Sequence, residues 1–149
     1  MAREQQGEEV RWANRVREAG LRATRPRILV LATLRRVGGH RTADDVLSFL
    51  NEADASLSRG TVYKVLNDLA AAELVMQADH GPGATLYEIA DEWHHHFVCR
   101  SCGVVIDIPC YVGSKPCLDT DLPGAEVDEA QVIVRGRCPV CVADDGAVA

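Results

Sequence analysis

Aromatic residues and long apolar segments are scarce in this chain of 149 residues. With two Phe and two Trp, a hydrophobic core must consist mainly of Val, Leu, Ile and Ala. No apolar run approaches the roughly 18–20 residues that a membrane-spanning helix needs. The first twenty residues mix charges with single apolar residues and lack the apolar stretch of a signal peptide. These absences exclude a transmembrane helix and favour a cytoplasmic protein.

Basic residues are scarce in the second part of the chain. After residue 80 there are 4 Lys and Arg against 11 Asp and Glu, whereas residues 1–80 hold 12 against 11. Between Arg11 and Arg59 the balance rises to 10 basic against 5 acidic residues. Phosphate attraction depends on local charge, so the net charge of −6 does not exclude nucleic-acid binding by the first part. The asymmetry predicts two functional parts.

Apolar residues at helical spacing predict that the first part is α-helical. The predicted helices begin near Val10, Pro26, Thr42 and Ser58. Proline suits a first helical turn, residues 42–45 resemble a capping box, and serine is a good helix cap. The apolar stripe of the last helix consists of Val62, Val65, Leu66 and Leu69. This stripe leaves Tyr63 and Lys64 facing outward.

After residue 74 the helical spacing of the apolar residues ends. Two β-prone segments, 74–77 and 85–89, flank a turn-rich stretch at 79–83. Helices followed by a β-hairpin describe a winged helix, and the later strand candidates are 95–99, 104–108 and 131–135. A short helix near 113–121 and disorder after Cys141 complete the prediction. The predicted fold class is α+β, with an N-terminal winged-helix domain.

Four cysteines form two CxxC pairs, Cys99 with Cys102 and Cys138 with Cys141. Two chelating thiolate pairs are what tetrahedral Zn²⁺ requires. The 35 intervening residues exceed the usual zinc-ribbon spacing, so a small sub-domain must fold between the pairs. The alternatives are two disulfides or plain buried thiols, and disulfides are disfavoured in a cytosolic chain. We therefore predict a structural zinc site.

Three consecutive histidines precede Cys99. On a strand, His94 and His96 share one face and His95 lies on the other. Imidazole is a ligand for Fe, Ni, Cu and Zn, and Asp107, Glu88 and His40 are eligible further donors, although spacing does not show that they converge. A single histidine is more often a hydrogen-bonded polar residue than a metal ligand. A metal site and a purely structural role both stay open here.

Cys110 and Cys117 lie outside the CxxC pairs. They are compatible with a redox pair, a labile metal site, or small hydrophobic residues beside a loop.

The segment from Ser58 to Lys64 opens a helix. Backbone N–H groups near Ser58, Arg59 and Thr61 favour phosphate, and the outward Tyr63 and Lys64 are placed to reach base edges in a major groove. Such a helix by itself is more often an ordinary solvated helix. Its position in a helix trio before a hairpin, with a basic flank, favours DNA binding.

Several stretches together resemble the ferric uptake regulator (Fur) family over about residues 10–142. They are Gly20–Arg27, His40–Asp45, Thr61–Leu66, Tyr87-Glu88, His94–Asp107 and Gly136–Cys141. The resemblance is closest to the catalase-linked branch, often called FurA or CatR. It rests there on residues 94–105, on Cys110 and Pro116–Leu118, and on Asp128–Ile133.

The resemblance implies a winged-helix DNA-binding domain at 1–87, a hinge at 88–93, a dimerisation and metal-binding domain at 94–142, and a tail at 143–149. It implies a homodimer that represses transcription from a pseudo-palindromic operator when a regulatory metal, Fe²⁺ or Mn²⁺, is bound. The implied regulatory ligands are His40, Glu88, His94, His96 and Asp107. The CxxC cysteines match the structural zinc ligands of the family. Arg22 matches a minor-groove residue, and Tyr63 and Lys64 match residues near major-groove bases.

Two positions depart from the family pattern. Ala130 stands where a second, hinge-adjacent metal site usually has a histidine, and Glu88 stands where peroxide-sensing relatives have aspartate. We expect a repressor that responds to iron and peroxide and controls catalase or iron genes, and not an enzyme, since no HExxH motif is present. The alternatives are a zinc or nickel sensor, a metalloenzyme built on His94, His96 and Asp107, and a thiol redox or metal-storage protein.

Overall fold

The computed structural model describes residues 2–78, 83–118 and 120–146. The chain divides into two compact units, one ending at Asp91 and the other beginning at Glu92. The predicted turn at 79–83 falls almost entirely outside the described residues. Among the described helices, none is long and apolar enough to cross a membrane.

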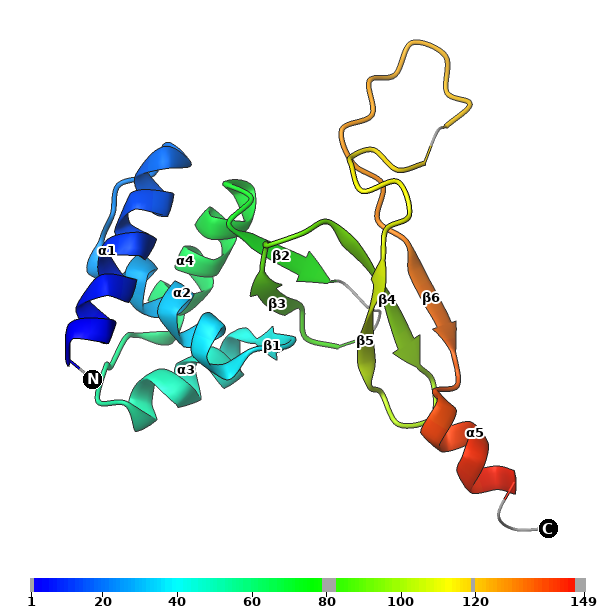
Figure 1. Cartoon of the computed structure of the whole chain (residues 1–149), viewed down its shortest axis with the longest axis horizontal. Helices are drawn as coiled ribbons and strands as arrows, with labels where there is room; N and C mark the ends of the chain where they lie inside the picture. Colours follow the sequence, from blue (N-terminus) through cyan, green and yellow to red (C-terminus); the bar gives the residue numbers. More distant parts are fainter. Residues whose placement is uncertain (1, 79–82, 119, 147–149) are drawn as a thin grey trace. The chain divides into compact units, whose positions relative to one another are not determined.

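The described residues of the first unit form four helices and a small sheet (Figure 1). The helices are α1 (Ala2–Glu18), α2 (Arg25–Val37), α3 (Ala43–Glu52) and α4 (Arg59–Ala71). The strands are β1 (Arg41–Thr42), β2 (Val75–Ala78) and β3 (Leu86–Ile89), in the antiparallel order β1-β3-β2. The winged-helix prediction is confirmed. Helix α1 begins well before Val10, because the polar residues there continue a helix without contributing apolar spacing.

Side-chain caps fix the starts of α3 and α4. The Thr42 hydroxyl accepts a hydrogen bond from the Asp45 amide at 3.0 Å, and the Asp45 carboxylate accepts one from the Thr42 amide at 2.8 Å. The Ser58 hydroxyl accepts from the Thr61 amide at 3.1 Å. Each cap satisfies backbone donors that have no partner within the helix, which is worth about 1 kcal/mol.

One hydrophobic core holds the first unit together. It includes Trp12 and Val16 from α1, Val30, Leu31 and Leu34 from α2, Val46 and Leu50 from α3, and Val62, Val65, Leu66 and Leu69 from α4. Fully burying a side chain of this kind stabilises the fold by roughly 1.5–3 kcal/mol. The predicted stripe of α4 is therefore confirmed, and it leaves Tyr63 and Lys64 on the exposed side.

In the part of the second unit that the structure describes, a three-stranded sheet is followed by a helix. The strands β4 (His94–Cys99), β5 (Val105–Pro109) and β6 (Ile133–Gly136) have the order β5-β4-β6. Strand β4 pairs antiparallel with β5 and parallel with β6. At the end of β6, a Cβ added to Gly136 would lie 3.2 Å from the ring of Phe97 in β4, so this close approach favours glycine.

Two predictions for the second unit are wrong. The described residues between 113 and 121 form no helix, because Gly113 has a positive φ of 74° and Pro116 lacks the amide that a helix interior requires. The segment 143–146 is not disordered but continues α5 (Pro139–Gly146). The last three residues of the predicted tail lie outside the described part of the chain.

Candidate metal centres and nucleic-acid interface

The four CxxC cysteines form one cluster in the second unit. Cys99 and Cys102 lie at the end of β4 and the turn after it, and Cys138 and Cys141 lie at the start of α5. The Sγ–Sγ distances are 3.9 Å from Cys99 to Cys141 and 3.8 Å from Cys102 to Cys138. Zn–S bonds of about 2.3 Å in a tetrahedron place the sulfurs about 3.8 Å apart. The cluster therefore fits a Zn²⁺ ion.

The pKa values of two thiols in this cluster, Cys99 and Cys141, are shifted in opposite directions. Backbone N–H groups of Cys102 and Cys138 lower the pKa of the Cys99 thiol to about 5. Hydrogen bonds with the Cys138 and Cys102 side chains raise the pKa of Cys141 to about 12. The Cys99 thiolate therefore forms readily, whereas the Cys141 thiol retains its proton in the absence of a cation. Binding of a metal ion to these ligands would displace that proton.

A second group of donors lies on one face of β4. His96 lies directly opposite Asp107 in the β4–β5 pair, and His94 shares that face. The His94 Nε2–Asp107 Oδ1 distance is 3.5 Å, and the His96 Nε2–Asp107 Oδ1 distance is 4.0 Å. The His96 side chain is fully buried, whereas Asp107 is largely exposed. Two imidazoles and a carboxylate in this arrangement can chelate a first-row divalent metal.

The first unit brings together His40 and Glu88. His40 follows the end of α2 through Gly38 and Gly39, whose positive φ angles turn the chain toward β1. Glu88 lies in β3 opposite Met76. The His40 Nε2–Glu88 Oε2 distance is 3.3 Å, and both side chains are about 10% exposed. Burial of a charged carboxylate costs free energy unless the carboxylate is paired or coordinates a metal. His40 and Glu88 are therefore also eligible as metal ligands.

A third group lies on the opposite face of β4. A ring nitrogen of His95 and the sulfurs of Cys110 and Cys117 all lie within 4.8 Å of one another. Sequence spacing placed His95 on its own face of the strand but did not connect it with the two cysteines. The connection depends on how the loop after β5 folds back, which has no local sequence signal.

Helix α4 presents the predicted nucleic-acid-binding residues. Ser58 caps its first turn, and its hydroxyl also lies 2.8 Å from that of Thr61. The Arg59 guanidinium forms an ion pair with Asp44 at 2.9 Å and lies 5.5 Å from the centre of the Tyr63 ring. This contact holds the exposed Tyr63 ring beside the start of the helix.

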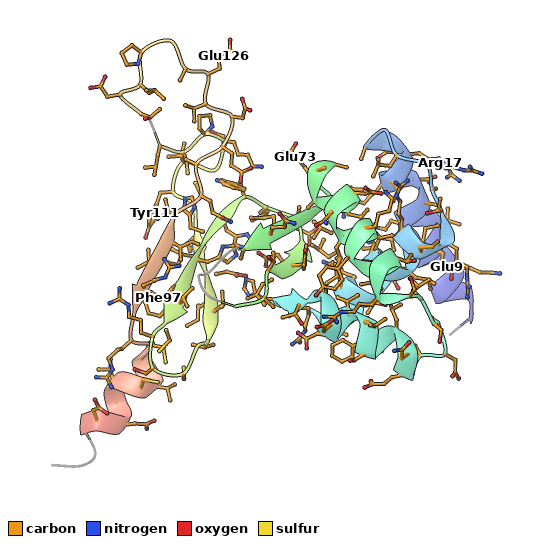
Figure 2. The ribbon with its side chains drawn as sticks, turned by 180° about the vertical axis from the view of Figure 1, so that it is seen from behind. Glu9, Arg17, Glu73, Phe97, Tyr111 and Glu126 are labelled. Atoms are coloured by element: carbon orange, nitrogen blue, oxygen red, sulfur yellow. The ribbon has the colours of Figure 1, made fainter. Side chains whose placement is uncertain are left out.

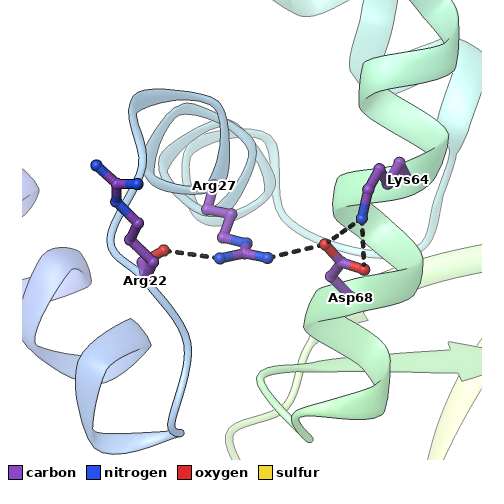
Figure 3. Close-up of polar contacts among 4 residues, drawn as sticks. All are labelled: Arg22, Arg27, Lys64 and Asp68. Carbon is purple, nitrogen blue, oxygen red and sulfur yellow. Dashed lines mark hydrogen bonds and ion pairs between the residues drawn. The ribbon is translucent and has the colours of Figure 1, made fainter.

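A chain of polar contacts missed by the sequence analysis crosses from α2 to α4 (Figure 3). The Asp68 carboxylate accepts hydrogen bonds from Arg27 at 2.9 Å and from Lys64 at 3.0 Å. Arg27 also donates to the Arg22 backbone carbonyl at 2.8 Å, which fixes the segment before α2 while the Arg22 side chain stays exposed. The i, i+4 spacing of Lys64 and Asp68 was visible in the sequence, whereas the contact of Arg27 was not.

The chain matches the model of one protein family, which is described as the ferric uptake regulator family, over residues 18–111. It is 41% identical over 137 residues to the transcriptional regulator FurA of Mycobacterium tuberculosis, which covers 90% of this chain and 92% of that protein.

Solved structures share the fold. The ferric uptake regulator from Pseudomonas aeruginosa with manganese superposes with a TM-score of 0.68 at 29% identity, covering 86% of this chain and 98% of that one. A zinc uptake regulator complexed with zinc and DNA superposes with a TM-score of 0.64 at 21% identity, covering 95% and 97%. The second similarity is evidence for the shared fold alone.

Proposed function

This chain belongs to the ferric uptake regulator family of transcriptional regulators, and from that premise we propose that it is a homodimeric repressor that binds a pseudo-palindromic DNA operator when a regulatory divalent metal is bound. The structural metal is Zn²⁺ on the four CxxC cysteines. The regulatory metal is Fe²⁺ or Mn²⁺, and the controlled genes are catalase or iron genes that respond to iron and peroxide.

The observation that carries the proposal is the distribution of donors over the two units. The first unit holds His40 and Glu88 at 3.3 Å, and the second holds His94 and His96 beside Asp107. Neither set alone has enough donors for a complete coordination sphere, whereas five nitrogen and oxygen donors suit an iron or manganese ion. We propose that both sets share one ion in the DNA-binding state.

Donors divided in this way couple metal concentration to the arrangement of the units. A ligand shifts a conformational equilibrium only by its differential affinity for the two states, and split donors provide that difference. At a free metal concentration a hundredfold above Kd, the shift is about 2.7 kcal/mol, or roughly a hundredfold in population. In a dimer this shift holds two α4 helices at the separation of two operator half-sites.

The proposed DNA contacts are Arg22, Ser58, Arg59, Thr61, Tyr63 and Lys64. The cap of α4 leaves backbone N–H groups for a phosphate, and the exposed Tyr63 and Lys64 are placed for base edges and backbone. The exposed Arg22 suits a narrow minor groove.

A gel-shift series on the DNA upstream of the coding sequence tests the proposal. Zinc-loaded dimer is titrated anaerobically with Fe²⁺, Mn²⁺, Zn²⁺ or Ni²⁺, and each series is repeated after peroxide treatment. We expect Fe²⁺ or Mn²⁺ to tighten binding about a hundredfold and peroxide to reverse the effect of Fe²⁺. Equal binding with and without regulatory metal would contradict the proposal. A response to Zn²⁺ or Ni²⁺ at lower free concentration would support the alternative that the protein senses those metals.

A further inference from the structure

The face of β4 opposite His94 and His96 carries chemistry that the metal centres do not use. There the Cys117 sulfur lies 3.2 Å from His95 Nε2, and the Cys110 sulfur lies within 4.8 Å of the Cys117 sulfur and of a ring nitrogen of His95. Both cysteines are free thiols and half-buried. Cys110 follows the end of β5, whereas Cys117 lies in the loop that leads to β6.

Hydrogen bonds determine which nitrogen of His95 carries its proton. The Val132 amide donates to His95 Nδ1 at 3.4 Å, so Nδ1 supplies a lone pair. In the neutral ring the proton is then on Nε2, directed at the Cys117 sulfur. A metal bound at Nε2 would need the lone pair of that atom. The proton of the neutral ring would then be on Nδ1, where it would face the Val132 N–H and the hydrogen bond between them would be lost. The arrangement therefore favours thiol chemistry over a third metal site.

The Cys110 sulfur lies in a turn of backbone donors. Burial raises the pKa of the Cys110 thiol, but hydrogen bonds from the Gly113 and Val112 amides and from the Cys117 side chain lower it, and the net pKa is below its ordinary value. Gly113 has φ 74°, and this left-handed conformation forms the turn. A stabilised thiolate beside a second thiol is the usual arrangement of a peroxide-reactive pair.

We propose that Cys110 and Cys117 form a hydroperoxide-reactive dithiol, with His95 as a positioning residue, separate from both metal centres. The Cys110 thiolate attacks one oxygen of hydrogen peroxide; an S–O bond forms, the O–O bond breaks, and the released hydroxide takes a proton to become water. The Cys117 sulfur then attacks the Cys110 sulfenic acid. An S–S bond forms, the S–OH bond breaks, and the hydroxide leaves as water with the Cys117 proton. Two thiols are oxidised by two electrons, and one peroxide is reduced to two waters.

The pair lies in a part of the chain outside the regular secondary structure. A disulfide bond is about 2.05 Å long, so the sulfurs must approach from their present separation. The described residues between Cys110 and Val132 form no helix or strand, and Tyr111 is 97% exposed. Figure 2 labels Tyr111 and Glu126 in this loop. Cys99 and Cys138, by contrast, are buried within the zinc cluster. Zinc coordination would protect their thiolates while the dithiol reacts.

This inference goes beyond the proposed function, because the dithiol needs neither a regulatory metal nor DNA. Its test measures thiols on the full-length, zinc-loaded protein. After reduction, the protein is treated with one equivalent of hydrogen peroxide in a metal-free buffer, alkylated, and mapped by mass spectrometry. Cleavage after Tyr111 separates Cys110 from Cys117, and Cys102 provides an internal control.

We expect Cys110 and Cys117 to lose alkylation together, with two thiols lost per peroxide and zinc retained. Cys117→Ser should stop at a Cys110 sulfenic acid that a 1,3-dicarbonyl reagent traps, and Cys110→Ser should leave Cys117 reduced. His95→Ala should slow formation of the disulfide at least tenfold without changing the rate of sulfenic acid formation, and His95→Gln, which retains an N–H donor, should restore part of it.

Three results would overturn the proposal. The first is full alkylation of Cys110 and Cys117 after peroxide. The second is earlier oxidation of the CxxC cysteines with release of zinc. The third is a further equivalent of tightly bound metal that Cys117→Ser removes, which would identify a metal site instead.

Discussion

Arg27 and Asp68 form an ion pair of 2.9 Å although 41 positions separate them in the sequence. The pair ties α2 to α4, and Lys64 binds the same carboxylate from one turn earlier on α4. One of the exposed cations of α4 is therefore partly neutralised within the protein before any phosphate approaches. Asp68 therefore contributes to the stability of the first unit and also reduces the positive charge that α4 would present to DNA.

Asp68→Asn should make the free energy of unfolding depend less on pH in the acid range. Arg27 first, and Lys64 second, lower the pKa of Asp68 below its ordinary value of 3.8. A lowered native pKa stabilises the folded state above the ordinary pKa, and this stabilisation is lost as the pH falls through the native pKa. Urea unfolding should show the variant less stable than the parent at pH 7, with the difference shrinking below about pH 4.

A matched control for this test is Glu52→Gln, which removes an exposed carboxylate from α3. It should change stability little at either pH. A constant difference between Asp68→Asn and the parent across the acid range would contradict the assigned role of the carboxylate.

Lys64→Ala and Tyr63→Ala should each weaken operator binding by about 1–3 kcal/mol while zinc content stays unchanged. Both side chains are exposed, so their removal leaves the core intact. For Lys64→Ala, the slope of log affinity against log salt should fall by about one if the ammonium binds a phosphate. Fluorescence anisotropy over a salt series measures both quantities.

Asp68→Asn provides the opposite test of the same surface. Release of Lys64 from its carboxylate partner should tighten DNA binding at low salt, with a smaller effect at high salt. Unchanged affinity in all three variants would show that α4 does not contact the operator.

Local features of this protein were readable from the sequence, and long-range pairings were not. The caps at Thr42 and Ser58 and the buried stripe of α4 depend on residues within a few positions of one another. The alternation of side chains along a β-strand likewise predicted that His95 lies on the face opposite His94 and His96. The pairing of His96 with Asp107 depends on the register of β4 and β5, which spacing alone does not define.

The loop after β5 was the least predictable part for the same reason. A short helix was predicted there, but the positive φ of Gly113 and the missing amide of Pro116 are incompatible with a regular helix. The approach of Cys117 to His95 is then set by loop closure. At the other end of the chain, the prediction of disorder after Cys141 is wrong for the described residues, because α5 continues to Gly146.

Cys99→Ser should abolish zinc binding and destabilise the second unit. Cys99 is 1% exposed, and its sulfur also accepts a hydrogen bond from the Cys138 amide at 3.3 Å. Loss of one thiolate leaves three donors around a tetrahedral ion, and the free energy of zinc binding is part of the folding free energy. Metal analysis should show no bound zinc, and gel filtration should show loss of dimer.

The control for the zinc test is Cys110→Ser, which removes a cysteine outside the cluster. It should retain one zinc per chain and the dimer. A stable, zinc-free dimer of Cys99→Ser would contradict a structural role for the ion.

His94→Ala and His95→Ala separate the two faces of β4. His94 lies 3.5 Å from Asp107 among the proposed regulatory ligands, whereas His95 lies on the opposite face beside Cys117. In reducing buffer, His94→Ala should abolish metal-stimulated operator binding, a loss of about a hundredfold, while circular dichroism and zinc content stay unchanged. His95→Ala, the same truncation one residue away, should retain the metal response under these conditions. Equal losses in both variants would indicate damage to β4 and not removal of a ligand, and a normal metal response in His94→Ala would show that the regulatory ion binds elsewhere.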